Sequence, residues 1–241
     1  MTSNHDSTGP RAQLNFDGDY GVNYKAIIRG SVPGYDTMLE ITAAALADTC
    51  TEAESIVVVG PGRGEELPLL LTALPTAQFI LIEPSAQMQA ACQKELEQAN
   101  AVARCKILDV ALSPDSDFEH GQADAVVCLN VLHLMPKDEQ IKLLHSIADQ
   151  IKPGGRFLIA SHSEPDSEHG FDTLLGIAKQ RLRDRGASND VIEKMMQARN
   201  TSVYSLDQST LEQGLSESGM TSPILLQQSL FSRLWISQKT A

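Results

Sequence analysis

The chain has little positive charge, no long apolar run and no paired cysteine motif. Its 19 lysines and arginines are outnumbered by 31 aspartates and glutamates, which gives a formal net charge of −12. This excess of negative charge disfavours long-range attraction to nucleic acid or to an anionic membrane. No apolar run approaches the ~20 residues that a membrane-spanning helix requires. The N-terminal residues Met1 to Pro10 also lack the apolar core of a signal peptide. We therefore expect neither nucleic acid nor membrane as a partner.

The four cysteines, Cys50, Cys92, Cys105 and Cys128, are scattered along the chain. They form no Cys-x-x-Cys pair and no cluster with histidine, which predicts reduced thiols in a cytoplasmic protein and no metal site. With 241 residues, of which 42% are hydrophobic and 21% charged, the chain has the composition of one sizeable globular domain with a small appendage. These properties favour a small-molecule substrate.

The most informative segment is a glycine-rich turn after a β-branched run. Ile56 to Val59 are continuously apolar, as in a strand buried on both faces of a parallel sheet, and Gly60-Pro61-Gly62-Arg63-Gly64 follows. Glycines at alternate positions allow a sharp bend and let backbone N–H groups approach a ligand. A dinucleotide fingerprint would require glycine at position 65, where this chain has Glu65. The turn therefore indicates a nucleotide-type cofactor other than a dinucleotide.

A second apolar run, Phe79 to Ile82, ends at Glu83, roughly 20 residues after the turn. A carboxylate at this spacing can accept hydrogen bonds from both ribose hydroxyls of an adenosine. The Gly-x-Gly-x-Gly turn together with this glutamate resembles the class I S-adenosylmethionine (SAM) methyltransferases. That resemblance implies SAM as cofactor and S-adenosylhomocysteine as product.

Strand-like and helix-like segments alternate along the chain, which predicts right-handed crossovers and a doubly wound α/β sheet. Asp36 and Ser85 are expected to cap helices, and Ser205 to Gln208 resembles a capping box. Pro136 is expected to open a helix that Pro153-Gly154-Gly155 ends. The predicted strands are 55–59, 79–82, 104–108, 124–130, 156–161, 224–228 and 230–237, and the predicted helices 36–49, 67–74, 86–99, 136–151, 171–185, 189–199 and one after 205.

The last two strands have almost no loop between them, which predicts a C-terminal antiparallel hairpin. The fold class is thus a Rossmann-like, seven-stranded class I methyltransferase sheet with this hairpin and a helical lid. The expected organisation is an N-terminal helical lid segment at 1–50, a SAM-binding core at 51–163, a helical lid or substrate insert at 164–204, and a final helix and hairpin at 205–241.

Three further segments carry a narrower resemblance. They are Ile27 to Tyr35, which contains Ser-Val-Pro-Gly-Tyr, the exit of the fourth strand at Leu129 to Leu134, and the Pro-Gly-Gly turn. Together they resemble the carboxy-S-adenosylmethionine synthase family and its relatives of the tRNA uridine-5-oxyacetic acid methyltransferase type. The similarity runs thinly from about residue 16 to the C-terminus, and it implies a homodimer.

This resemblance also implies roles for individual residues around the cofactor. Gly60, Pro61 and Gly62 would line its methionine part, and Glu83 would hold the ribose. The remaining cofactor positions implied are Tyr35 above the ligand, Asp109 and Val110 at the adenine, and Asn130 near the sulfonium and amino group.

The chain departs from that family at the lid. The synthases carry an arginine there that grips the carboxylate of their unusual cofactor, and by position it falls on Met196 here. Arg199 lies three residues on, on a neighbouring helix face. A buried carboxylate without a bidentate partner is costly, whereas plain SAM needs no such arginine. We take Arg29, Met196 and Arg199 as candidate substrate residues.

His133 and His162 follow the fourth and fifth strands, at the sheet edge that faces a cofactor. Either can act as a general base or orient an acceptor. Three functions remain open from the sequence: a SAM-dependent methyltransferase acting on a small molecule, a carboxy-SAM synthase that uses a prephenate-like carboxyl donor, and a non-catalytic SAM-binding protein.

Overall fold

The computed structural model describes residues 15–112, 122–165 and 167–241 of the chain. The segment Met1 to Pro10 and the start of the predicted lid segment 1–50 lie outside these residues. A seven-stranded sheet runs through the centre, in the order β3-β2-β1-β4-β5-β7-β6. Its strands are β1 (Ser55–Val59), β2 (Gln78–Ile82), β3 (Cys105–Leu108), β4 (Ala123–Leu129), β5 (Ile151–His162), β6 (Ile224–Ser229) and β7 (Ser232–Gln238).

Strands β1 to β5 pair in parallel, whereas β7 is antiparallel to both β5 and β6. The predicted seven-stranded α/β sheet with a C-terminal antiparallel hairpin is therefore confirmed. The strand order reverses between β1 and β4, and in open α/β sheets ligands bind outside the carboxyl ends of the strands at such a reversal. The glycine turn follows β1, and Asn130 follows β4, so these two segments flank the reversal.

Alternate residues of the central strands point to opposite faces of the sheet, and helices cover both faces. Ile56 and Val58 belong to one core cluster and Val57 and Val59 to another. The first cluster joins α2 (Tyr35–Thr49), α3 (Leu67–Ala73) and α4 (Ala86–Gln98) to the sheet, and the second joins α5 (Lys137–Gln150) and α8 (Gln208–Glu217). The buried run that predicted β1 thus packs against helices on both sides.

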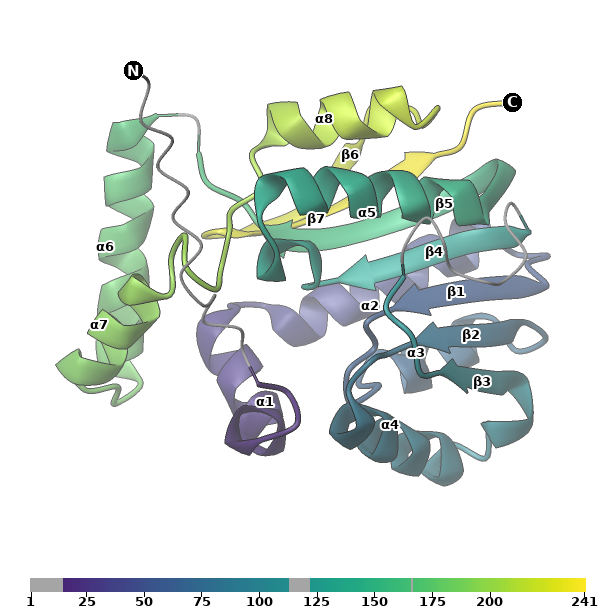
Figure 1. Ribbon diagram of the computed structural model, residues 1–241, viewed down its shortest axis with the longest axis horizontal. Helices are drawn as coiled ribbons and strands as arrows, with labels where there is room; N and C mark the ends of the chain where they lie inside the picture. Colours follow the sequence, from purple (N-terminus) through teal and green to yellow (C-terminus); the bar gives the residue numbers. More distant parts are fainter. Residues whose placement is uncertain (1–14, 113–121, 166) are drawn as a thin grey trace, which may run out of the picture.

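Three further helices gather at one end of the sheet. Figure 1 shows α1 (Asp19–Ser31), α6 (Glu168–Asp184) and α7 (Asn189–Gln197) beyond the end toward which the arrowheads of β1 to β4 point. Two short 3-10 turns, η1 (Val102–Arg104) and η2 (Leu132–Leu134), complete the described elements. No helix among the described ranges is long and apolar enough to cross a membrane. The arrangement places helices over the carboxyl edge.

Two expected helix boundaries are wrong, one because of a strand pairing and one because of a glycine cap. Pro153-Gly154-Gly155 does not end a helix, because α5 stops at Gln150 and Ile151 already pairs with Ala123 in β5, ahead of a bulge. Asp36 does not cap α2. Gly34 holds the N-cap position in a left-handed conformation, with φ 71°, and Asp36 lies in the first helical turn.

Candidate functional site

The glycine turn follows β1, and its glycines adopt left-handed backbone conformations. Gly60 and Gly62 both have positive φ, 64° and 56°. A Cβ on Gly60 would lie 2.5 Å from Val131 Cγ2, whereas a Cβ on Gly62 would meet no atom within 4 Å. The first glycine is therefore required by a close approach to the chain after β4. The second borders room that a ligand can occupy.

Glu83 at the end of β2 closes one side of this turn. Its carboxylate is buried and accepts hydrogen bonds from the backbone N–H of Gly62, at 2.9 Å, and of Ser85, at 2.9 Å. Burial raises the pKa of Glu83, and these two backbone donors oppose that rise. Because each carboxylate oxygen can accept more than one hydrogen bond, capacity remains for further donors. Two backbone groups thus fix the orientation of this side chain.

A pocket of about 460 Å³ opens next to Glu83. Ser85 lines this pocket, and Leu134 of η2 faces it from the segment after β4. The other residues around it come from the chain before α1, the β2–α4 connection and the loop after α7, and the full lining is Asn15, Phe16, Asp17, Pro84, Ser85, Leu134 and Ser202. This pocket therefore lies at the carboxyl edge of the sheet, under residues that precede the first lid helix.

The remaining cofactor candidates lie along the same edge. Asp109 follows β3 and accepts a hydrogen bond from Gln89 Nε2 at 3.0 Å, and the same amide donates to the carbonyl of Glu83 at 2.7 Å. Val110 is exposed. Asn130 is buried with φ 61°, and its Nδ2 lies 4.0 Å from Met38 Sδ on α2. The sequence-predicted residues after β1, β2, β3 and β4 are thus brought to one edge.

Tyr35 and Arg29 lie at the junction of α1 and α2. Tyr35 is buried as the first residue of α2, and the guanidinium of Arg29 lies 5.1 Å from the centre of its ring. Arg29 also donates from Nε and Nη2 to Asp36, at 3.0 Å and 2.6 Å. The guanidinium is therefore already neutralised by a carboxylate of the protein.

Two acidic residues, Glu65 and Glu66, follow the glycine turn at the position where a dinucleotide fingerprint has its third glycine. Glu65 Oε2 accepts from Arg29 Nη1 at 2.5 Å, and Lys25 Nζ lies 3.4 Å from Oε1, so this carboxylate holds α1 against the turn. Burial raises the pKa of Glu66 to about 8, so its carboxyl group is largely protonated at neutral pH. The role of Glu65 was not predicted, because its partners lie on a helix that the sequence patterns did not assign.

We expect Glu65→Gln to loosen α1 from the domain. The change removes the charge that pairs with Lys25 and Arg29, while the side chain keeps its size. Charge-assisted hydrogen bonds of this kind contribute about 1.5–3 kcal/mol. Amide hydrogen exchange in residues 19–31 should accelerate by ~10-fold or more. Asp36→Asn, which breaks the Arg29 pair within the lid, is the control and should leave the link to Glu65 in place. Unchanged exchange in the Glu65→Gln protein would refute this role.

His133 and His162 lie side by side, with ring centroids 6.3 Å apart. The backbone N–H of His162 donates to His133 Nδ1 at 3.3 Å, and the His162 ring stacks on Phe231 with centroids 5.1 Å apart. Burial lowers the pKa of His133 to about 3 and that of His162 to about 4. Both imidazoles are therefore neutral at pH 7 and each has one nitrogen able to accept a proton.

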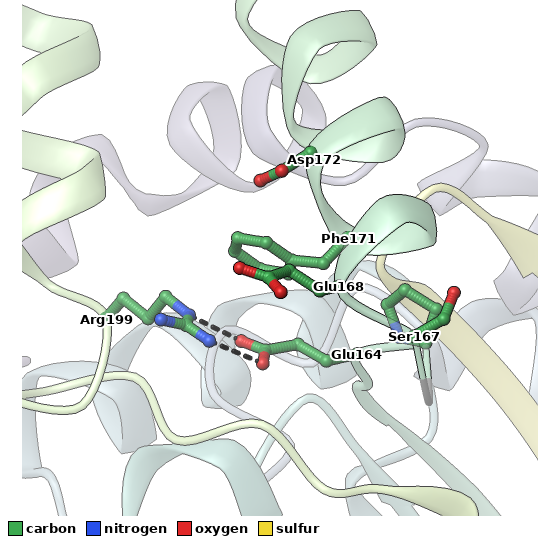
Figure 2. A pocket seen from close by; sticks show the side chains of 7 residues that line it. Glu164, Ser167, Glu168, Phe171, Asp172 and Arg199 are labelled. Carbon is green, nitrogen blue, oxygen red and sulfur yellow. Dashed lines mark hydrogen bonds and ion pairs between the residues drawn. The ribbon is translucent and has the colours of Figure 1, made fainter.

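Arg199 pairs with Glu164 at the end of β5. Its Nε and Nη2 donate to the two carboxylate oxygens of Glu164, each at 2.7 Å, and its guanidinium lies 4.4 Å from the centre of the Phe171 ring. Figure 2 shows Glu168, Phe171 and Asp172 of α6 above this pair. The pocket between them has a volume of about 370 Å³ and is lined by Glu164, Pro165, Ser167, Glu168, Phe171, Asp172 and Arg199. Met196 of α7 is half-buried and does not line it.

Ser205, like Asp36, does not cap the helix that it was predicted to cap. It does not open α8, since Asp207 is the N-cap and accepts from the backbone N–H of Thr210. The Ser205 hydroxyl instead lies 2.8 Å from His162 Nδ1 and donates to Glu164 Oε1 at 2.8 Å. Within the described ranges, no group of three or more His, Cys, Asp or Glu side chains could hold a metal ion.

Comparison with known proteins agrees with this geometry. Residues 56–155 match the family model described as a methyltransferase domain. The chain is 24% identical over 201 residues to carboxy-S-adenosyl-L-methionine synthase of Colwellia psychrerythraea. This alignment covers 79% of this chain and 81% of that protein. A stretch of 79 residues is 34% identical to squalestatin hexaketide synthase of Phoma sp., and it spans 32% of this chain but 3% of that much longer protein.

Solved structures share the fold. Magnesium protoporphyrin IX methyltransferase from Synechocystis, with bound SAH, superposes with a TM-score of 0.68 at 16% identity over 93% of this chain and 96% of that one. An O-methyltransferase family protein from Burkholderia thailandensis gives a TM-score of 0.63 at 17% identity over 86% of this chain but 58% of that one. The sheet and the matched domain define a class I methyltransferase fold. The matched methyltransferase domain covers residues 56–155, less than half of the chain, and carboxy-SAM synthase is among the proteins to which the chain is similar.

Proposed function

We propose that this protein binds SAM at the carboxyl edge of the sheet and transfers its methyl group to a small molecule. The observation that carries the proposal is the pair formed by Glu83 and Gly62. The Glu83 carboxylate is held by two backbone N–H groups, and a Cβ on Gly62 would meet no atom of the described residues within 4 Å beyond its chain neighbours. A ribose whose hydroxyls donate to Glu83 would fit this arrangement, because the acceptor is fixed before the ligand arrives.

The other predicted residues support the same orientation. In this proposal Gly60, Pro61 and Gly62 flank the methionine part, Asp109 and Val110 meet the adenine, and Asn130 faces the sulfonium and amino group. Tyr35 covers the ligand from α2. When bound, SAM supplies a methyl group already activated by its positive sulfur. The task of the protein is then to hold the acceptor close to that carbon and in line with it.

We place the acceptor beneath α6 and α7, where Glu164, Phe171 and Arg199 surround the smaller pocket. Its lining includes the acidic side chains Glu168 and Asp172. Glu164 lines the pocket and lies two residues after the end of β5, which neighbours β4 at the carboxyl edge. This location keeps the acceptor on the same edge as the cofactor. It also assigns segment 164–204 to the acceptor and segment 1–50 to the cofactor side of the lid.

A second candidate function, carboxy-SAM synthesis, is favoured by the sequence similarity to the Colwellia enzyme. The ion pairs argue against it. A carboxylated cofactor needs a cation for its extra carboxylate, and both candidate arginines already hold protein carboxylates, Arg29 those of Asp36 and Glu65, and Arg199 that of Glu164. Breaking either pair would leave a partly buried carboxylate without its partner. Plain SAM requires no such exchange.

Mass spectrometry of the ligand that remains on the purified protein tests these functions. We expect SAM or S-adenosylhomocysteine, and with methyl-labelled SAM we expect label to enter a compound of a small-molecule extract of cells. Carboxy-SAM on the protein would overturn the methyltransferase proposal in favour of synthesis. Binding of SAM without transfer to any compound of the extract would favour a non-catalytic SAM-binding protein. Light scattering in solution tests the predicted homodimer.

A further inference from the structure

A continuous chain of hydrogen bonds links Arg199 to His162. Arg199 holds the carboxylate of Glu164, Glu164 Oε1 accepts from the Ser205 hydroxyl at 2.8 Å, and Ser205 Oγ lies 2.8 Å from His162 Nδ1. The four groups come from two segments, residues 162–164 at the end of β5 and residues 199–205 after α7, which meet there. None of these contacts is explained by helix capping or by packing alone.

The direction of each hydrogen bond follows from the number of protons available. The Arg199 guanidinium holds the pKa of Glu164 below its usual range, so Glu164 is ionised and only accepts. Ser205 has a single hydroxyl proton, which it donates to Glu164. Its contact with His162 therefore requires His162 to donate, which places the imidazole proton on Nδ1. The Nε2 atom of His162 is left with its lone pair.

His133 has the opposite arrangement. Its Nδ1 accepts the backbone N–H of His162 at 3.3 Å, so a neutral His133 has its proton on Nε2. The two neighbouring histidines, which the sequence alone cannot distinguish, are therefore not equivalent. At Nε2, His162 is an acceptor and His133 is a donor.

We propose that Ser205 and Glu164 are positioning residues that hold His162 as the Nδ1–H tautomer, so that its Nε2 removes a proton from the methyl acceptor. His133 presents its Nε2–H as a hydrogen-bond donor and does not act as the base. The part played by His162 in transfer rests on the proposed function, whereas the tautomers rest on the hydrogen bonds alone.

Backbone hydrogen bonds hold the main chain of both histidines beside the segment 204–206. Leu206 N–H donates to the carbonyl of His162 at 2.9 Å, and Tyr204 N–H donates to the carbonyl of His133 at 2.8 Å. Ser205 lies between Tyr204 and Leu206, so these two backbone hydrogen bonds hold its hydroxyl close to His162. Stacking on Phe231 restricts rotation of the His162 ring. This is the arrangement by which a hydrogen-bonded partner selects a histidine tautomer.

Methyl transfer to the acceptor would proceed with removal of one proton by His162. His162 Nε2 takes the proton of an acceptor O–H or N–H group as the acceptor's lone pair forms a bond to the methyl carbon. The bond between that carbon and sulfur breaks, and its electrons stay on sulfur. One positive charge thus passes from the sulfonium donor to the His162 imidazolium. Glu164 stabilises that cation through Ser205, and His162 later loses the proton to water.

Nuclear magnetic resonance of protein labelled with 15N-histidine tests the proposal directly. Long-range proton–nitrogen spectra at pH 7 to 8 report which ring nitrogen holds the proton, and His133→Gln and His162→Gln proteins assign the signals. The charged and titratable groups facing His162 are Glu164, Arg199 and His133. We expect the Nδ1–H form for His162 and the Nε2–H form for His133. The reverse pattern would overturn the proposal.

Two substitutions at one position separate positioning from structure. Ser205→Ala should shift the tautomer ratio of His162 toward Nε2–H by ~10- to 100-fold, because it removes a charge-linked hydrogen bond. Ser205→Thr keeps the hydroxyl and should retain the wild-type spectrum. An unchanged His162 tautomer in folded Ser205→Ala protein would refute the relay. Failure to bind SAM in calorimetry would instead refute the proposed function and leave the tautomer assignment standing.

Discussion

Replacing Glu83 with alanine is expected to weaken SAM binding by ~100-fold or more. If Glu83 accepts both ribose hydroxyls, the change removes two hydrogen bonds to a charged acceptor, each worth about 1.5–3 kcal/mol, and ~100-fold corresponds to about 2.7 kcal/mol. It also leaves the backbone N–H groups of Gly62 and Ser85 without their partner, so the turn loses its fixed orientation. Isothermal calorimetry of the purified variant with SAM measures the effect.

Two control substitutions make this test specific. Glu83→Gln keeps the size of the side chain but turns an amide group toward one of the two backbone donors, so we expect an intermediate loss of affinity. Asp109→Asn changes a carboxylate at the next strand end that is bonded to Gln89, and it should weaken binding by only a few-fold. A SAM affinity of Glu83→Ala equal to that of the wild-type protein would contradict the ribose assignment.

The sheet could be predicted because the local sequence of each strand identifies it. Val57, Val58 and Val59 are all buried although they point to alternate faces of the sheet, and continuous β-branched runs identify such strands without knowledge of their neighbours. The glycine turn and Ser85, which caps α4 as expected, are likewise set by local backbone requirements. The order of the strands was not predicted, because it depends on pairings between distant segments.

The lid helices α6 and α7 were predicted close to their observed ranges, but the range of the N-terminal helix α1 was not, because long-range contacts hold that helix. Besides the packing of Ile28, α1 is held by the ion pairs of Lys25 and Arg29 with Glu65, and Asp17 just before it accepts a hydrogen bond from Ser85. Ser205 matched a capping pattern, but its hydroxyl serves Glu164 and His162. Local patterns miss such contacts because the partners are distant in sequence.

Within the candidate site, the positions of the cofactor residues could be predicted, but the availability of the two arginines could not. The predicted cofactor residues, from Gly60 to Asn130, all lie at strand ends, so their meeting at one edge follows from a parallel sheet. The candidate substrate residues Arg29 and Arg199 both have carboxylate partners in the structure. Whether an arginine is available depends on neighbours that no local motif encodes.

The second large effect is expected at the turn glycines. Gly60→Ala should mainly reduce the stability of the protein, whereas Gly62→Ala should mainly weaken SAM binding. Both positions have positive φ, which costs an alanine about 1–2 kcal/mol. At Gly60 the new methyl also overlaps Val131, so we expect a total loss of ~3 kcal/mol in the free energy of unfolding by urea. At Gly62 only the backbone cost applies to stability, but the methyl enters the space proposed for SAM and should weaken its binding by at least ~10-fold.

Val131→Ala provides the decisive comparison. Combined with Gly60→Ala it removes the atom that the new methyl would meet, so the double variant should recover about 1–2 kcal/mol relative to the sum of the single changes. Combined with Gly62→Ala it should recover nothing, because a Cβ there meets no atom of the described protein within 4 Å. Equal stability and equal SAM affinity of the two single variants would show that the turn does not separate a packing glycine from a ligand-facing one. The proposed cofactor position above Gly62 would then be wrong.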